Sequence, residues 1–211
     1  MLSIEKLLDR SVDLANDLGA FLVLTPADTS PRVTSSRNLC GVSFEHAESV
    51  RVLIATGNFT SSLGVLRMQY EALVKSVWAL YSASDAHIGK LKAELNNETA
   101  ASSDNLPSLA DMLNQLGGKA PPQAIGPLLE FKQYSWRPLS SYVHGGIHAI
   151  TRHSEGYPQQ LLDQALRSSN GLLMMAGMLL VILSGDPIHS GKISSIQRRI
   201  ADCCPPPNVS T

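Results

Sequence analysis

The feature that most constrains the fold is the spacing of apolar residues between positions 60 and 83. They recur every three or four positions, which places them along one face of a helix. No segment of the chain shows a convincing alternation of apolar and polar residues, as a half-buried strand would. The sequence therefore predicts an all-α protein. The members of this apolar stripe are Leu63, Leu66, Tyr70, Leu73, Val74, Val77, Leu80 and Tyr81.

The same criterion predicts further helices, separated by proline, glycine and polar turn residues. Because helices with one apolar face bury that face against one another, we expect an antiparallel bundle of four to five long helices with short accessory helices. A single domain should span residues 1–204, with a flexible insertion at 96–106 and a disordered tail at 205–211. The other predicted helices lie at 3–24, 35–56, 86–95, 107–116, 121–134, 158–183 and 188–202.

Composition limits the partners and the compartment. The formal net charge is −1, which argues against a broad electrostatic grip on nucleic acid, so DNA is not expected and any contact with RNA should be local. The most apolar run, at 171–184, has fourteen residues, fewer than the ~20 that cross a bilayer, so we interpret it as a core helix and expect no membrane contact. Three cysteines without regular spacing, Cys40, Cys203 and Cys204, and an early charged N-terminus predict the cytoplasm.

The stretch at 136–148 concentrates the polar chemistry of a mostly aliphatic chain. Pro138 suits the first turn of a helix, so a helix is predicted to start there. Arg137 and His144 then lie seven residues apart, or two turns, and return to one face. A cation beside an imidazole suits phosphate chemistry, but it is also what a buried polar cluster between helices looks like. Gly145 and Gly146 mark a place where another backbone or a ligand is expected to approach closely.

Arg67 and Glu71 form a second polar pair, four residues apart on the strongest predicted helix. On a surface this spacing gives a weak ion pair. In so apolar a helix at least one of the two should be half buried, and a buried charge needs a partner. We expect that partner to be His144 or Arg137, with Glu71 fixing the tautomer of the imidazole. The pair then belongs either to a structural network or to the floor of a pocket.

Arg137 and His144 together resemble the R-x4–6-H motif of the HEPN superfamily (higher eukaryotes and prokaryotes nucleotide-binding). The Arg67–Glu71 pair and the later stretch 141–145 are similar to bacterial helical families associated with it, and the likeness in architecture covers roughly 35–184. The departure is Pro138, which stands where active members usually carry a polar residue.

This resemblance implies a metal-independent endoribonuclease of a toxin–antitoxin or phage-defence system, working as a homodimer on RNA without a cofactor. His144 would be the acid/base and Arg137 the phosphate clamp. A protein partner such as an antitoxin would accompany it. The expected supporting residues are Arg67, Glu71, Ser141, Tyr142 and His148.

Two alternatives remain open. The first is a non-catalytic helical module that binds a protein partner or a small ligand. The second is a metal-dependent hydrolase that uses His144 and His148, which are four residues apart and able to share an ion on one helix face. The residues that could add further ligands are His153, Glu155 and Asp163.

Overall fold

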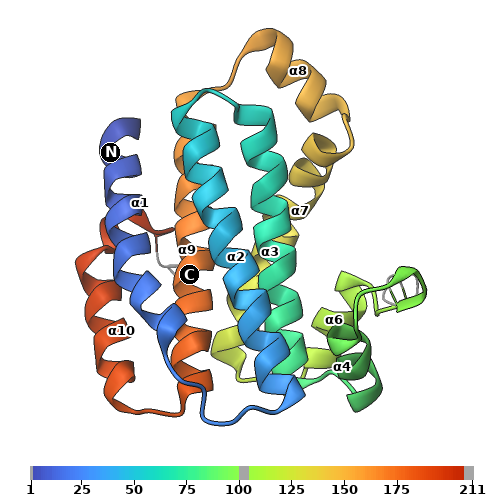
Figure 1. The fold of residues 1–211 in the computed structure, drawn as a ribbon. Coiled ribbons are helices and arrows are strands. Elements are labelled where there is room, and N and C mark those ends of the chain that lie inside the picture. Colours follow the sequence, from blue (N-terminus) through green and yellow to red (C-terminus); the bar gives the residue numbers. More distant parts are fainter. Residues whose placement is uncertain (1, 100–104, 207–211) are drawn as a thin grey trace.

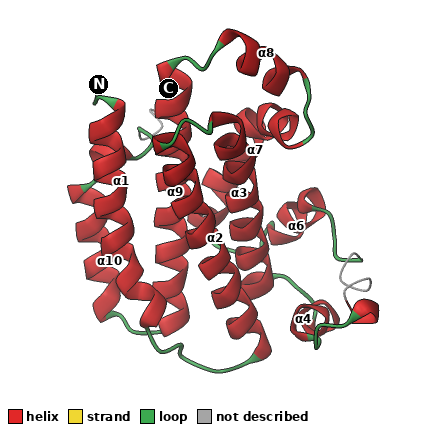
Figure 2. Cartoon of the chain, turned by 45° about the horizontal axis from the view of Figure 1, so that its top comes forward, coloured by secondary structure: helices red, strands yellow, loops and turns green. Residues whose placement is uncertain are grey.

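The computed structural model describes residues 2–99 and 105–206, and within these ranges helices and loops occur without any strand (Figure 2). The prediction of an all-α protein is confirmed. The predicted insertion at 96–106 and tail at 205–211 fall partly on residues 100–104 and 207–211, which lie outside the described residues. Asn96 and Thr99, at the start of that insertion, hydrogen-bond each other's backbone N–H groups at 3.0 and 2.9 Å.

Long helices packed side by side form the body of the molecule (Figure 1). Helix α2 (Pro31–Ala55) and helix α3 (Phe59–Tyr81) are joined by a short turn and run antiparallel. Both contact α9 (Gln159–Ser184), which also packs against α1 (Ile4–Gly19). The remaining elements are η1 (Ala20–Val23), α4 (Asp85–Lys92), α6 (Leu109–Leu116), α7 (Pro122–Val143), α8 (Ile147–Glu155), α10 (Ile188–Arg199) and η2 (Ala201–Cys203).

The core lies between α1, α2, α3 and α9, and the predicted apolar stripe of α3 faces it. The side chains of Tyr70 and Leu73, which belong to the stripe, have no measurable exposure to solvent, and neither does that of Trp78 on the same helix. Helix α9 is long and apolar enough to cross a membrane by length and composition alone, but 67% of its most apolar window is buried inside the protein. That degree of burial is typical of a core helix.

Helix α2 begins at Pro31, four residues before the predicted start at position 35. The side chain of Ser30 caps it by accepting a hydrogen bond from the N–H of Val33 at 3.3 Å. Proline at the first helical position costs no hydrogen bond, because that N–H would have no partner in any case. The helix therefore begins directly after the loop that precedes it, and the sequence prediction placed its first residue too late.

Buried polar side chains join the long helices. Gln69 of α3 and Ser169 of α9 bond each other reciprocally: the Gln69 side-chain amide donates to the Ser169 carbonyl at 2.9 Å, and the Ser169 hydroxyl donates to Gln69 Oε1 at 2.7 Å. At the edge, Arg10 of α1 makes a two-pronged contact with Asp202 of η2, at 3.0 and 2.9 Å. The first of these contacts holds α3 against α9, and the second holds η2 against α1.

Helix α7 corrects the prediction that one helix ends near 134 and another starts at Pro138. It is a single helix from Pro122 to Val143, with Pro127 and Pro138 inside it. An internal proline costs about 3 kcal/mol because it removes a backbone hydrogen bond and crowds the preceding turn. Here packing outweighs that cost, because side chains on both sides of Pro138 pack against neighbouring helices. Trp136 lies edge-on to Tyr70 of α3, 6.1 Å between ring centres, and Leu139 is buried.

The chain reverses sharply after α7, at a corner formed by residues 141–148. Gly145 has φ +62, and the N–H of Gly146 donates to the Ser141 carbonyl at 2.7 Å, which is the Schellman ending of a helix. The Ser141 hydroxyl then accepts from the N–H of His148 at 2.9 Å, in the first turn of α8. The predicted close approach is found at Gly146 only, where a Cβ would lie 2.6 Å from Ser141 Oγ and 3.3 Å from Ser141 Cα; nothing lies within 4 Å of such an atom at Gly145. The glycines end a helix rather than interrupt one.

Candidate functional site

Arg67 is the centre of a polar cluster on the seam between α3 and α7. Its Nε donates to Glu71 Oε1 at 2.8 Å, one turn along α3, and its side chain is only 15% exposed. The guanidinium carbon lies 4.2 Å above the centre of the Trp136 ring, in cation–π geometry. Because α7 stays helical through Pro138, Trp136 is held firmly beneath this cation. Two contacts from two helices therefore fix the guanidinium in place.

His144 completes this group, which we call the Arg67 cluster (Arg67, Glu71, Trp136 and His144). It occupies the position that follows the last residue of α7 and is exposed. Its Nε2 lies 3.2 Å from Nη1 of Arg67. A guanidinium only donates, so Nε2 is the acceptor, and the neutral ring carries its proton on Nδ1. The cluster thus presents a solvent-facing imidazole of defined tautomer beside an immobilised cation.

The guanidinium that bonds His144 comes from α3 and not from the predicted residue, Arg137. Arg137 is exposed and makes no hydrogen bond or ion pair with the described residues. The sequence predicts that the Arg67–Glu71 pair is half buried and takes a partner from the stretch at 136–148. The low exposure of both side chains and the contact between Arg67 and His144 agree with this expectation. Glu71 bonds Arg67, and the tautomer of the imidazole follows from Arg67 instead of from the carboxylate.

Ser141, Tyr142 and His148, the other predicted supporting residues, take different places. Ser141 serves the corner between α7 and α8 through its bond to the His148 N–H. The Tyr142 ring is buried and lies 6.2 Å from the imidazole of His148. Burial raises the pKa of the Tyr142 hydroxyl, Tyr157 adds to the rise, and the guanidinium of Arg152 opposes it. Tyr142 and His148 line a cavity, and Ser141 belongs to the corner, so none of the three is part of the Arg67 cluster.

The alternative of a metal site at His144 and His148 lacks a third ligand. Over the ranges that the structure covers, no group of three or more histidine, cysteine, aspartate or glutamate side chains is placed to hold an ion. Asp163 pairs instead with Arg167, whose Nε lies 2.7 Å from its Oδ2. Within the described ranges, His144 and His148 therefore lack the additional ligand that the predicted metal site requires.

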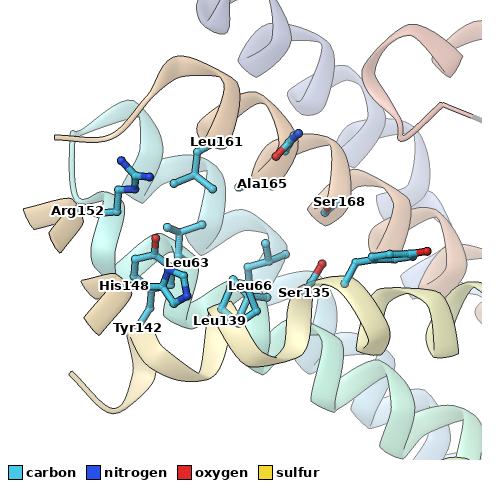
Figure 3. Close-up of a pocket in the computed structure, with 13 residues that line it drawn as sticks. Leu63, Leu66, Ser135, Leu139, Tyr142, His148, Arg152, Leu161, Ala165 and Ser168 are labelled. Atoms are coloured by element: carbon cyan, nitrogen blue, oxygen red, sulfur yellow. The ribbon is translucent and has the colours of Figure 1, made fainter. Parts of the chain in front are cut away.

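A cavity of about 330 Å³ lies between α3, α7, α8 and α9, and the sequence prediction missed it (Figure 3). Its walls are largely aliphatic, and His148 and Arg152 of α8 lie at one end with Tyr142. The available signal was the second face of α7: Pro138, Leu139 and Tyr142 recur at helical spacing on it. A spacing of this kind predicts that the residues pack against a neighbouring helix. Here the neighbouring helices do not fill the space beside α7, and the cavity remains between them. The aliphatic lining includes Leu63, Leu66, Leu139, Leu161 and Ala165.

Comparison with known proteins places most of this architecture in one family. A family model described as "Family of unknown function (DUF6988)" matches residues 40–206, from within α2 to beyond η2, and includes both the Arg67 cluster and the cavity. No curated protein and no solved structure matches the chain. Nothing in these comparisons links the chain to the HEPN superfamily.

Proposed function

The chain belongs to the DUF6988 family, and since that family has no known function, we propose an activity from the Arg67 cluster: metal-independent cleavage of RNA. The observation that carries the proposal is the 3.2 Å contact between Nη1 of Arg67 and Nε2 of an exposed His144. A fixed cation next to an accessible imidazole is the minimum that cleavage by a 2′-hydroxyl requires, namely charge stabilisation at the phosphate and a proton acceptor.

The guanidinium of Arg67 keeps one of its nitrogen donors available for a phosphate group. Its Nε is occupied by Glu71 and its Nη1 by His144, whereas Nη2 has no hydrogen-bond partner among the described residues. An incoming phosphodiester would accept from Nη2 and would compete with His144 for the donors of Nη1. That competition would free Nε2 of His144 at the moment when substrate arrives. Glu71 and Trp136 would keep the guanidinium from following the substrate.

In the proposed reaction, Nε2 of His144 takes the proton of the 2′-hydroxyl, and the 2′-oxygen attacks phosphorus. The bond to the 5′-oxygen breaks, this oxygen takes a proton from solvent, and a 2′,3′-cyclic phosphate and a 5′-hydroxyl end result. Arg67 would stabilise the extra negative charge on the phosphorane oxygens. Arg67 thereby takes the clamp role that the resemblance assigned to Arg137, and Arg137 becomes the residue to test beside it.

We also propose that the protein acts in the cytoplasm as a homodimer under the control of a protein partner such as an antitoxin. Three apolar side chains support a protein interface near His144: Val143, Ile147 and Ile150 are 43%, 75% and 65% exposed. Apolar side chains this close together on a surface are typical of a contact region. Light scattering that shows a monomer at micromolar concentration would remove the dimer from the proposal.

The test is cleavage of a labelled RNA oligonucleotide in EDTA by purified wild type and by His144→Ala, Arg67→Gln and Arg137→Gln. We expect His144→Ala and Arg67→Gln to lose cleavage by about 100-fold or more, the usual contribution of a general acid or base or of one charge-stabilising donor. His153→Ala, an exposed histidine on α8, is the matched control and should cleave like wild type.

A substrate with a single 2′-deoxy position at the cleaved bond should resist cleavage, because the attacking oxygen is absent. Loss of activity in Arg137→Gln with full activity in Arg67→Gln would return the clamp to Arg137 and refute the assignment made from the contact. Equal RNA integrity in all samples, including wild type, would eliminate the ribonuclease and leave the non-catalytic module.

A further inference from the structure

The cavity and the Arg67 cluster lie on different faces of α7, so they are separate features. Trp136 and His144 meet Arg67 on the side toward α3. The cavity is lined from α7 by Ser135, Leu139 and Tyr142, and its opposite wall comes from α9. A function for the cavity therefore does not depend on the ribonuclease proposal.

The lining divides into an aliphatic middle and a cationic end. Figure 3 shows Leu63, Leu66 and Leu139 in the middle, with Arg152, His148 and Tyr142 gathered at one end and Ser135 and Ser168 at the other. Such a distribution, with apolar walls and a few polar groups at defined places, is that of a small-molecule site.

Arg152 is the most informative residue of this lining. It is partly buried on α8, and within residues 2–99 and 105–206 its guanidinium makes neither a hydrogen bond nor an ion pair. Other partly buried arginines have partners within the protein: Arg67 pairs with Glu71, Arg167 pairs with Asp163, and Arg37 donates to the carbonyl of Leu22. The Tyr142 hydroxyl, which the same guanidinium influences, also has no hydrogen-bond partner in the described part of the chain. A guanidinium and a phenol that are left open at the end of an apolar cavity are suited to an anion.

We propose that the cavity binds a medium-chain aliphatic carboxylate, with the carboxylate on Arg152 and the hydrocarbon chain along the leucines. The planar fork of arginine matches a carboxylate in two parallel hydrogen bonds, and the Tyr142 hydroxyl adds a third donor. A cavity of about 330 Å³ has room for a ligand of roughly ten non-hydrogen atoms, given ~30 Å³ for each water in the liquid. Octanoate has this size and shape.

The experiment is calorimetric titration of the full-length protein with octanoate and with 1-octanol, which has the same chain and no charge. We expect octanoate to bind at one site per chain and at least tenfold more tightly than octanol. Arg152→Gln should weaken octanoate roughly 10- to 100-fold, as expected for losing hydrogen bonds from a charged group, and leave octanol unchanged. Arg198→Gln, an exposed arginine near the end of α10, is the matched control and should bind octanoate like wild type.

A second variant tests the hydrocarbon end. Leu161→Gln places an amide in the aliphatic lining at a half-buried position, so it should weaken octanoate and octanol alike. Unchanged circular dichroism and melting of both variants exclude unfolding as the cause. The proposal is overturned if octanoate and octanol bind equally well, if neither binds at millimolar concentration, or if Arg152→Gln binds octanoate like wild type. His144→Ala should leave octanoate affinity unchanged, which separates this site from the Arg67 cluster.

Discussion

The reciprocal bond between Gln69 and Ser169 should be one of the strongest polar determinants of stability in this protein. Both side chains are buried, with exposures of 0% and 1%. Ser169→Ala removes the donor to Gln69 Oε1 and leaves that oxygen without a partner in a region that water does not reach. An unsatisfied buried acceptor costs about 1–3 kcal/mol, so we expect the free energy of unfolding to fall by about 2 kcal/mol. For a chain of this length, that corresponds to a fall in Tm of about 5 °C.

A double-mutant cycle tests the reasoning behind this number. Gln69→Leu alone leaves the Ser169 hydroxyl to bond a carbonyl of its own helix, which serine does readily, so its cost should be smaller. Gln69→Leu with Ser169→Ala removes both partners and should cost less than the sum of the two single changes, by about 1 kcal/mol or more. Urea unfolding of the four proteins gives the coupling, and Ser168→Ala, the neighbouring serine, is the control expected within about 0.5 kcal/mol of wild type.

Additive effects in that cycle would refute the argument, because they would mean that the two side chains do not satisfy each other. A large loss in Ser168→Ala would also refute it, since it would show that any serine-to-alanine change in this part of α9 destabilises the protein.

Three further substitutions test the fold. Arg10, through its hydrogen bonds, lowers the pKa of Asp202, so this carboxylate stabilises the folded state above its unfolded pKa of about 3.9, and the contribution is lost as pH falls through the lower folded value. Asp202→Asn should therefore lower the urea midpoint slightly at pH 5–8, because the group is half exposed, and the difference from wild type should vanish near pH 2. Gly146→Ala should cost about 1–3 kcal/mol in thermal unfolding because its Cβ would lie 2.6 Å from Ser141 Oγ, whereas Gly41→Ala, with nothing within 4 Å, should stabilise α2 by about 0.5–1 kcal/mol. A pH-independent difference in the first case, or equal effects of the two glycine changes, would contradict these expectations.

The sequence was sufficient for most of the helices, because burial of one helix face leaves a period of apolar residues that can be recognised within a single segment. The apolar stripe of α3 is an example, since its spacing follows from helix geometry alone. Helix α7 was predicted wrongly for the opposite reason. The penalty of Pro138 is local and visible, whereas the packing of Trp136 and Leu139 that outweighs it involves other helices.

The candidate site shows the same limit. Spacing along one helix suggested that Arg137 accompanies His144, but no spacing rule can report that Arg67, 77 residues earlier, reaches the same imidazole. The composition of α3 did give the useful hint, because a charged pair in so apolar a helix requires a partner. The cavity had only a weaker signal, the spacing of apolar residues on the second face of α7. Whether apolar faces meet or leave a gap depends on the volumes of side chains from four helices, α3, α7, α8 and α9.

The corner at 141–148 links α7, which contributes to the Arg67 cluster, to α8, which lines one end of the cavity. His144 and His148 lie four positions apart, one on each side of this corner, and the Ser141 hydroxyl and the turn at Gly145 hold the segment between them. Because both ends of this short loop are held by hydrogen bonds, a tilt of α8 would also move the last turn of α7. The corner therefore sets the angle between the two helices, and a substitution that loosens it would displace both the imidazole beside Arg67 and the end of the cavity at His148.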